Sequence, residues 1–345
     1  MKLLMITRKV DWKDVSPAAF TYTWVKKIGE KLDKLYVITW QRSDGENLSK
    51  NIEIISLSGN KFLKIFILQF KLLKVLSRVD GVFCHQNPEY TILSAPLVKL
   101  FEKRIIAWYT HGSVNWKLKL VNLLANKIVT ASEKSCRLKN RKKIEVIGHG
   151  IDTEKFSRIL DNKDKEKFNI ISAGRISPTK DLRLLIDAID ILIKKGIKDV
   201  KLKIIGKAVL KRDHKYLNGL RELVKEKRLE KCISFGEASY SVMPIKYSSA
   251  DLMINLSQTG SIDKAVLEAM ACETMILTSN EAFENILDKR LMFKPKDSQD
   301  LTDKIVNLIN LSDEEKQKIS QSLRNEVVNN HNLDKLVGKI LALYK

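Results

Sequence analysis

Two basic side chains stand close together in a loop that follows an apolar run. The segment Ile170–Leu182 is typical of a strand that ends at Gly174, followed by Arg175 and by a helix that begins near Lys180. A guanidinium and an ammonium at one strand end suit a diphosphate. The alternative is that both are ordinary surface cations, but their position in a loop after a strand favours the binding interpretation.

A carboxylate in an apolar helix is the second chemical feature. A polar loop leads to Gly260 and Ser261, where Ser261 can act as a helix N-cap. The helix that follows is almost wholly apolar over residues 265–271 except for Glu268, and such a setting is costly for a carboxylate without a partner. A ribose diol is one suitable partner, and the free N–H groups of the helix start suit a phosphate. The alternative partner is Lys264, one helical turn before Glu268.

Short apolar runs without alternation predict strands that are covered on both faces. Helical segments fill the gaps, and such strand–helix alternation is typical of parallel sheets. The sequence therefore predicts an α/β protein of two Rossmann-like, doubly wound parallel-sheet domains. The predicted strands are Leu3–Ile6, Leu35–Thr39, Ile52–Ile55, Val82–Cys84, Ile105–Tyr109, Ile128–Thr130, Val146–Ile147, Ile170–Ser172, Leu202–Ile205, Ile233–Phe235, Leu252–Ile254 and Met275–Thr278.

Residues 152–167 carry mixed charges without apolar periodicity and form the predicted domain boundary. We expect an N-terminal domain over 1–155, a C-terminal domain over 156–330, and a last helix in 331–345 that can cross back to the first domain. Two such domains would face each other across a cleft. Ligands of open α/β sheets bind outside the carboxyl ends of the strands, which is where the basic loop lies.

These motifs resemble the retaining GT-B glycosyltransferases of the family-4 type, also called glycosyl transferases group 1. In that family a strand–Gly-Arg–x4–Lys loop binds the donor diphosphate. A motif of two glutamates separated by seven residues precedes an Ala-Met-Ala-Cys-like helix. The resemblance covers the second half of the chain strongly and the first half weakly. Further matching segments are Val146–Phe156, Phe235-Gly236, Met243-Pro244 and Ala250-Asp251.

The resemblance implies an enzyme that transfers a sugar from a nucleotide-sugar donor (a UDP- or GDP-sugar) to an acceptor, with retention and without a metal or other cofactor. Arg175 and Lys180 would neutralise the diphosphate leaving group, and Glu268 would accept hydrogen bonds from the ribose. His111, in a His-Gly loop after a predicted strand, would orient the sugar; the alternative is a loop histidine held by backbone hydrogen bonds. The donor-binding residues would be Gly174, Arg175, Lys180, Gly260, Ser261, Asp263 and Glu268.

The chain departs from the family pattern at several positions. Gly260 stands where the family has its first glutamate, so the sugar contact would fall to Asp263, Ser261 or Thr259. Cys272-Glu273 replaces the family's Cys-Gly turn. His149 replaces the hinge asparagine and, with His85, is a further candidate for the site. The loop Lys13–Ala19 lacks the Gly-Gly pair that often follows the first strand in the family.

The composition is that of a soluble globular protein with a strong basic surplus. The 345 residues carry a net charge of +21, and residues 1–150 hold 27 Lys+Arg against 12 Asp+Glu. Nucleic acid, an anionic membrane and phosphorylated substrates are all candidate partners of such a chain. The four cysteines lack C-x-x-C spacing, which favours reduced buried thiols. No secretory signal and no bilayer-spanning run is recognisable, which predicts a cytoplasmic protein.

One segment of the first half is both basic and amphipathic. On a helix over Lys61–Arg78 the cations cluster on one side, with apolar residues around the rest. Such a helix can lie on an anionic membrane, which would make the protein peripheral on the inner membrane face. The alternative, which every α/β unit favours, is a scaffold helix packed on the sheet with a solvated basic edge. The basic segments 116–120 and 137–143 add to this half.

Three other functions stay open at the level of sequence. A nucleotide-sugar-binding protein without transfer activity is compatible with Gly260. A sugar-nucleotide epimerase shares the two-domain architecture. A nucleic-acid-binding protein would fit the charge, but no recognition motif is present and aromatic residues make up only 7% of the chain, so no nucleic acid is expected. The favoured acceptor is a lipid-linked or cell-envelope glycan, a role in polysaccharide biosynthesis.

Overall fold

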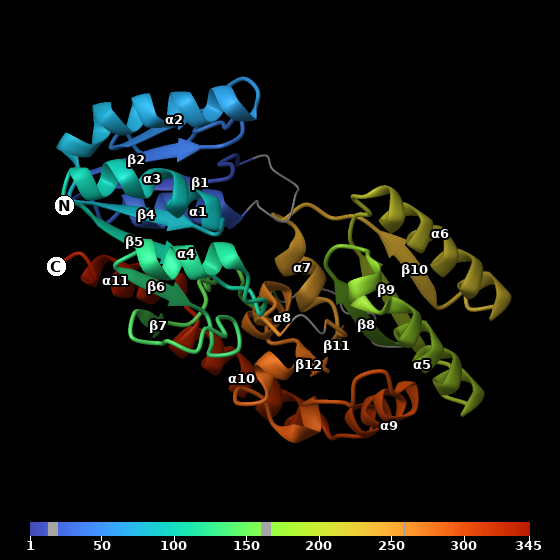
Figure 1. The fold of residues 1–345 in the computed structure, drawn as a ribbon. Coiled ribbons are helices and arrows are strands. Elements are labelled where there is room, and N and C mark those ends of the chain that lie inside the picture. Colours follow the sequence, from blue (N-terminus) through green and yellow to red (C-terminus); the bar gives the residue numbers. More distant parts are fainter. Residues whose placement is uncertain (13–19, 160–166, 258–259) are drawn as a thin grey trace. The chain divides into compact units, whose positions relative to one another are not determined.

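The computed structural model describes residues 1–12, 20–159, 167–257 and 260–345 (Figure 1). The loop Lys13–Ala19, residues 160–166 of the predicted domain boundary, and Thr259 lie outside these residues. The chain divides into two compact units. Unit 1 comprises Met1–Asp152 and Asn332–Lys345, and unit 2 comprises Thr153–His331.

Unit 1 is built on a seven-stranded parallel sheet with the order β3-β2-β1-β4-β5-β6-β7. Its strands are β1 (Lys2–Thr7), β2 (Lys34–Thr39), β3 (Ile52–Ser56), β4 (Gly81–His85), β5 (Arg104–Trp108), β6 (Lys127–Thr130) and β7 (Ile144–Val146). Its helices are α1 (Phe20–Gly29), α2 (Lys61–Val75), α3 (Pro88–Leu100), α4 (Trp116–Leu124) and α11 (Leu333–Ala342), with a short 3-10 turn η1 (Leu76–Arg78).

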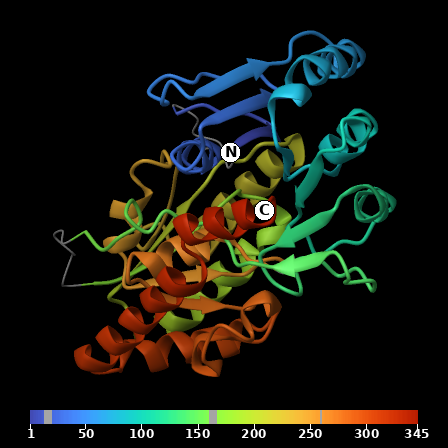
Figure 2. The same ribbon diagram turned by 90° about the vertical axis from the view of Figure 1, so that its left-hand side faces the viewer.

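Helices cover both faces of this sheet, so its central strands are apolar throughout. Helices α2, α3 and α4 lie side by side on one face, and α1 and α11 lie on the other (Figure 2). Leu4 and Ile6 of β1 expose no surface. Both belong to the same core cluster as Leu68 and Leu72 of α2, the helix that covers this face of the sheet. The helices on both faces therefore explain why apolar and polar residues do not alternate along these strands.

The last helix of the chain, α11, packs on α1 within unit 1. Gly150 makes the approach possible, because a Cβ there would lie 2.7 Å from both Leu333 and the Trp24 ring. An isolated β-bridge pairs the backbone of Ile151 with that of Asn332, the residue before α11. An ion pair of 3.2 Å between the Lys27 ammonium and the Asp334 carboxylate adds to the contact.

Unit 2 is built on a five-stranded parallel sheet with the order β10-β9-β8-β11-β12. Helix α5 packs against α6 and α9, and α8 packs against α7 and α10 (Figure 1). Its strands are β8 (Phe168–Ala173), β9 (Val200–Ile205), β10 (Ile233–Gly236), β11 (Leu252–Asn255) and β12 (Met275–Thr278). Its helices are α5 (Leu182–Lys194), α6 (Lys211–Glu226), α7 (Met243–Ser248), α8 (Lys264–Ala271), α9 (Ser298–Ile309) and α10 (Asp313–Asn330), with 3-10 turns η2 (Pro178–Lys180), η3 (Glu281–Phe283) and η4 (Lys289–Leu291).

The two parallel α/β sheets confirm the fold class predicted from the sequence, and each predicted strand has a counterpart. The largest shift in position is at β7, expected at Val146–Ile147 and observed at Ile144–Val146. Glu145 interrupts the apolar run there and hides the strand from a hydropathy pattern. In the structure Glu145 lies opposite Val129 in the sheet, and its carboxylate pairs with Lys127.

A close backbone approach fixes the carboxyl ends of β8 and β9. The Gly174 N–H donates to the Ile205 carbonyl at 3.0 Å, and the Gly206 N–H donates to the Gly236 carbonyl at 2.9 Å. A Cβ at Gly206 would lie only 1.8 Å from the Gly174 carbonyl oxygen. Gly174 itself has φ +141°, a conformation that residues with a side chain rarely adopt. The loop that begins at Gly174 is therefore held by two glycines.

We expect Gly206→Ala to lower the free energy of unfolding by about 2 kcal/mol or more, because the methyl group must displace the backbone at Gly174. Chemical denaturation measures this loss. Gly219→Ala is the matched control: Gly219 is exposed on α6 with open space around it, and alanine should stabilise that helix by about 0.5–1 kcal/mol. Equal stability of the two variants would contradict the role assigned to Gly206.

Candidate functional site

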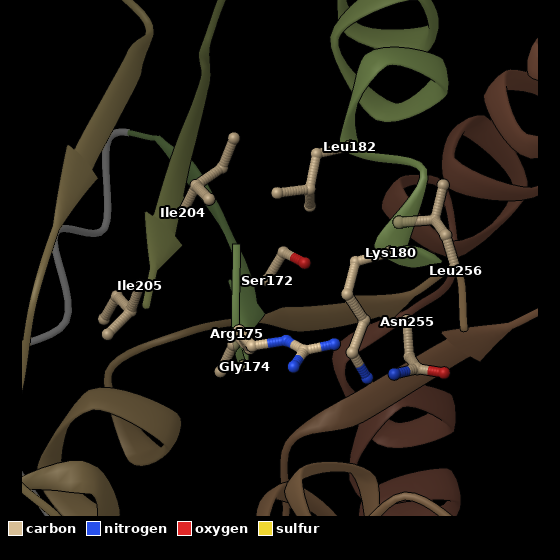
Figure 3. Close-up of a pocket in the computed structure, with 10 residues that line it drawn as sticks. Ser172, Gly174, Arg175, Lys180, Leu182, Ile204, Ile205, Asn255 and Leu256 are labelled. Carbon is tan, nitrogen blue, oxygen red and sulfur yellow. The ribbon is translucent and has the colours of Figure 1, made fainter. Parts of the chain in front are cut away.

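A pocket opens in unit 2 at the carboxyl ends of β8, β9 and β11 (Figure 3). The strand order reverses between β8 and β11, because β8 leads outward to β9 on one side while β11 and β12 extend the other. Such a switch point leaves a crevice in which ligands of open α/β sheets bind. The pocket is lined by Ser172, Ala173, Gly174, Arg175, Lys180, Leu182, Ile204, Ile205, Asn255 and Leu256.

The two cations predicted from the sequence both line this pocket. Arg175 is exposed at the start of the loop, and Lys180 ends the 3-10 turn η2. Figure 3 shows the Arg175 guanidinium extending toward the Lys180 side chain. The next residue, Asp181, has a left-handed backbone with φ +42° and begins α5. Because of this tight connection, Lys180 lies near the end of β8, and both cations of the loop line the same pocket.

Lys180 is paired with Asp263. Its ammonium lies 2.6 Å from the Asp263 Oδ2, and the two side chains expose 19% and 24% of their surface. Burial alone would raise the pKa of Asp263. The nearby Lys180 charge and the hydrogen bonds that Asp263 accepts from Lys180, Asn255 and Ser257 outweigh burial, so its pKa lies below its usual value. The lowered pKa favours the carboxylate form of Asp263, which lies against the Lys180 ammonium.

A polar network behind this pair fixes the segment that carries Asp263. The Asn255 amide donates to Asp263 at 2.9 Å, and the Thr278 hydroxyl donates to Asn255 Oδ1 at 3.1 Å. The Asn280 amide donates to the Ser261 carbonyl at 2.8 Å. Asn255, Thr278 and Asn280 are all buried, where polar groups need partners. Residues at the ends of β11 and β12 therefore position the loop before α8.

Glu268 lies on α8 and is 6% exposed, as the apolar pattern of the helix predicts. It accepts a hydrogen bond of 3.4 Å from the buried Tyr247 hydroxyl. Burial raises the pKa of Glu268 to about 7, although the Lys264 charge acts in the opposite direction. Burial also holds the pKa of Lys264 well below its usual value. Glu268 does not line the pocket, so it forms a separate polar centre within unit 2.

The candidate histidines all lie in unit 1. His111 is exposed in the loop after β5, where its backbone N–H donates to the Ser135 carbonyl at 2.8 Å and its ring Nδ1 lies 3.4 Å from the Ser113 hydroxyl. His85 and His149 expose 0% and 3% of their surface. The structure therefore leaves His111 open to solvent and encloses the other two.

His85 and His149 belong to an aromatic cluster. The Trp24 ring lies 4.8 Å from the His85 ring and 5.0 Å from the Trp108 ring, and Trp108 lies 5.6 Å from His149. The His149 Nδ1 accepts the Gly150 N–H at 2.9 Å. These contacts place both rings in the packing of unit 1. The sequence interpretation missed the cluster, for which Trp24 and Trp108 were the only signal.

The remaining predicted residues are distributed around the loop before α8. Gly260 is buried with φ +64°, and Ser261 is half-buried and held through its carbonyl. The prediction that Ser261 is the helix N-cap is wrong, because α8 begins at Lys264 and Asp263 is its N-cap. Sequence reasoning missed Asn255, Thr278, Asn280 and Tyr247. The signal for the first three was present, since Asn255 and Thr278 are the polar last residues of β11 and β12 and Asn280 follows two positions after β12.

Neither a metal centre nor a membrane span is found in the parts of the chain that the structure describes. No group of three or more His, Cys, Asp or Glu side chains there could hold a metal ion. None of the described helices is both long enough and apolar enough to cross a bilayer.

Comparison with known families decides the family. Residues 152–326, half of the chain and nearly all of unit 2, match the model of the family described as glycosyl transferases group 1. The chain belongs to this family. A curated relative from Escherichia coli, UDP-Gal:alpha-D-GlcNAc-diphosphoundecaprenol alpha-1,3-galactosyltransferase, is 27% identical, and the match covers 86% of this chain and 81% of the relative.

Solved structures extend the likeness to the whole chain. A glycosyltransferase from Rickettsia africae is 20% identical with a TM-score of 0.76, and covers 99% of this chain and 97% of its own. Anabaena Alr3699/HepE, solved in complex with UDP, is 17% identical with a TM-score of 0.80 and 99% coverage of both chains. These likenesses confirm the predicted GT-B fold. With the family match, they confirm that the protein is a glycosyltransferase that uses a nucleotide-sugar donor.

If Lys180 binds the donor diphosphate, Lys180→Met should weaken UDP binding about 10- to 100-fold while leaving uridine binding unchanged, because only UDP carries the diphosphate that the lost charge-assisted hydrogen bonds would reach. Isothermal titration calorimetry measures both affinities. The double variant Lys180→Met/Asp263→Asn avoids leaving an unpaired carboxylate and should lose UDP affinity equally. Lys318→Met, at an exposed lysine of α10, is the matched control. Wild-type UDP affinity in both Lys180 variants would refute the assignment.

The raised pKa of Glu268 predicts a pH-dependent affinity for the donor. If ribose hydroxyls donate to Glu268, only the carboxylate form binds them. The pKa of about 7 therefore makes the affinity for UDP-glucose rise between pH 6 and pH 8, by about tenfold, as the ionised fraction rises. UDP-glucose has no group that titrates in this range. Glu268→Gln should bind more weakly with a flat profile; an unchanged slope in that variant would contradict the role of Glu268.

Proposed function

We propose that the protein transfers a hexose from a UDP-sugar to a sugar linked to a polyprenyl diphosphate, with retention of anomeric configuration. The curated relative, named for UDP-galactose and a diphosphoundecaprenol acceptor, supports both the donor and the acceptor class. The structural relative Alr3699/HepE, solved with UDP-glucose as well as with UDP, supports uracil as the base. Retention rests on the family resemblance alone.

The observation that carries this proposal is the pair of cations at the switch point of unit 2. Arg175 and Lys180 line one pocket at the carboxyl end of β8. In sugar transfer the bond between the anomeric carbon and the diphosphate breaks, and negative charge accumulates on the departing phosphate. Two cations at this place stabilise that charge, which lowers the barrier. The same cations bind the donor in the ground state.

Asp263 gives this pocket a partner for Lys180 before the donor arrives. A half-buried ammonium without a counter-ion would be costly, and the 2.6 Å contact with Asp263 removes that cost. We infer that the donor diphosphate shares or takes over the Lys180 ammonium. Asp263 then becomes available to the hydroxyl groups of the sugar, a contact that Gly260 cannot make. Ser261 is fixed beside it by Asn280.

The other predicted residues complete the proposal. Glu268, as a carboxylate, would accept hydrogen bonds from the ribose, and Gly174 lets the backbone approach the diphosphate closely. His111, exposed after β5 of unit 1, would orient the sugar. Unit 1 would serve the acceptor and unit 2 the donor. We place the boundary between them at Asp152–Thr153, where the chain divides into its compact units.

A specific observation also supports a second function, donor binding without transfer, because Gly260 replaces the glutamate of the family motif. The two functions differ in product. We expect the full chain, given UDP-galactose and a GlcNAc-diphosphate-lipid, to form an α-linked disaccharide lipid.

In this assay Arg175→Ala should reduce kcat/KM at least about 100-fold, since it removes a charge contact of the transition state. Lys318→Met serves again as the control. NMR of the product reports the anomeric configuration. A β-linked product would refute retention, and UDP-sugar binding without transfer to any of a panel of lipid-linked acceptors would favour the binding protein.

A further inference from the structure

Helix α2 exposes its apolar face. Phe62, Phe66 and Phe70 are 82%, 73% and 50% exposed, and Leu63 and Leu73 are 47% and 49% exposed. We call these five residues the α2 stripe. The three phenylalanines are spaced by four residues and so lie along one side of the helix. An apolar stripe of this kind on a surface helix marks an interaction site.

The stripe is not part of the helix's contact with its own unit. Leu68, Leu72 and Val75 form the buried line of α2 and pack into the core under the helix. The sequence interpretation allowed for a helix packed on the sheet with a basic outer edge. The structure shows that packing, but the outer face is aromatic and aliphatic rather than basic.

Another surface helix of similar length shows what an ordinary outer face contains. The exposed residues of α6 in unit 2 are Lys211, Arg212, His214, Lys215, Asn218, Gly219, Arg221, Glu222, Lys225 and Glu226, none of which is apolar. Helix α2 therefore departs from the pattern that this chain itself uses where a helix meets water.

Cations flank the stripe and no acidic residue interrupts it. The segment Lys61–Arg78 contains no Asp or Glu. Lys61, Lys74 and Arg78 are exposed, and the Lys74 ammonium lies 4.3 Å from the centre of the Phe70 ring. Long basic side chains beside buried aromatic rings are typical of helices that lie in the headgroup region of a bilayer.

A second helix on the same face of unit 1 has a similar outer surface. Helix α4 lies on the same side of the sheet as α2, with α3 between them (Figure 2). Trp116 and Leu123 of α4 are 64% and 67% exposed, and Lys119 between them is exposed as well. The helical layer of unit 1 thus presents aromatic and basic residues from two elements.

We propose that the α2 stripe docks unit 1 on an anionic lipid bilayer. The phenylalanines enter the boundary between headgroups and acyl chains, and the flanking lysines contact the anionic headgroups. Charge favours this occupant over a second copy of the chain, because a symmetric contact would bring the same lysines against each other. It also favours lipid over nucleic acid, since apolar rings rather than cations occupy the centre of the surface. The proposal stands on this surface and does not need the proposed acceptor.

Vesicle co-sedimentation of the full chain, without donor or acceptor, tests the proposal. We expect the wild type to bind vesicles of phosphatidylcholine with phosphatidylglycerol, to bind pure phosphatidylcholine more weakly, and to lose affinity as salt rises. Phe66→Ser/Phe70→Ser should weaken binding at least about tenfold. Lys61→Gln/Lys74→Gln should weaken it about fivefold for each cation, on the anionic vesicles only.

Matched controls come from unit 2. Val209→Ser/Ile245→Ser changes two other exposed apolar residues, and Lys211→Gln/Lys215→Gln changes two exposed lysines of α6; both should bind vesicles like the wild type. The thermal midpoint of Phe66→Ser/Phe70→Ser should stay that of the wild type, because these rings are exposed. Three results would overturn the proposal: no vesicle binding by the wild type at low salt, undiminished binding by the phenylalanine variant, or a wild-type dimer that this variant dissociates.

Discussion

The Lys180–Asp263 ion pair is the interaction on which the proposed chemistry of unit 2 depends. An ammonium with 19% of its side chain exposed needs a counter-charge, and Asp263 supplies it only because Asn255, Thr278 and Asn280 hold the loop before α8 in place. Lys180 in turn reaches the pocket because Gly174 and Gly206 bring β8 and β9 together behind it. The position of Lys180 at the end of β8 thus depends on the close backbone approach, on the polar network and on the ion pair.

The sequence predicted those parts of this arrangement that have a local signal. Apolar runs located the strands, because strands covered on both faces cannot alternate. Arg175 and Lys180 were found because both follow a strand, and Glu268 because a carboxylate in an apolar helix is conspicuous. The pairing of Lys180 with Asp263 spans 83 positions of the chain, and no local pattern specifies it. The sequence predicted Asp263 as a donor-binding residue, a candidate for the sugar contact, but not as the partner of Lys180.

Burial was the property that the sequence predicted least well. His85, His149 and His111 all lie near strand ends or hinge segments, yet only His111 is exposed, because Trp24 and Trp108 enclose the other two. In α2 the sequence allowed for packing on the sheet but did not show how much of the apolar surface stays exposed. A hydropathy pattern identifies an apolar face but not whether the sheet covers it, and here Leu68, Leu72 and Val75 suffice for packing while Phe62, Phe66 and Phe70 remain outside.

The central claim is that the pocket at the end of β8 binds the diphosphate of the donor. The most direct measurement is the position of that diphosphate in a crystal of the protein grown with UDP. The account predicts phosphate oxygens within hydrogen-bonding distance of both Lys180 and Arg175, with the ribose at Glu268. A diphosphate bound elsewhere, with the Lys180–Asp263 pair unchanged and the pocket empty, would contradict it.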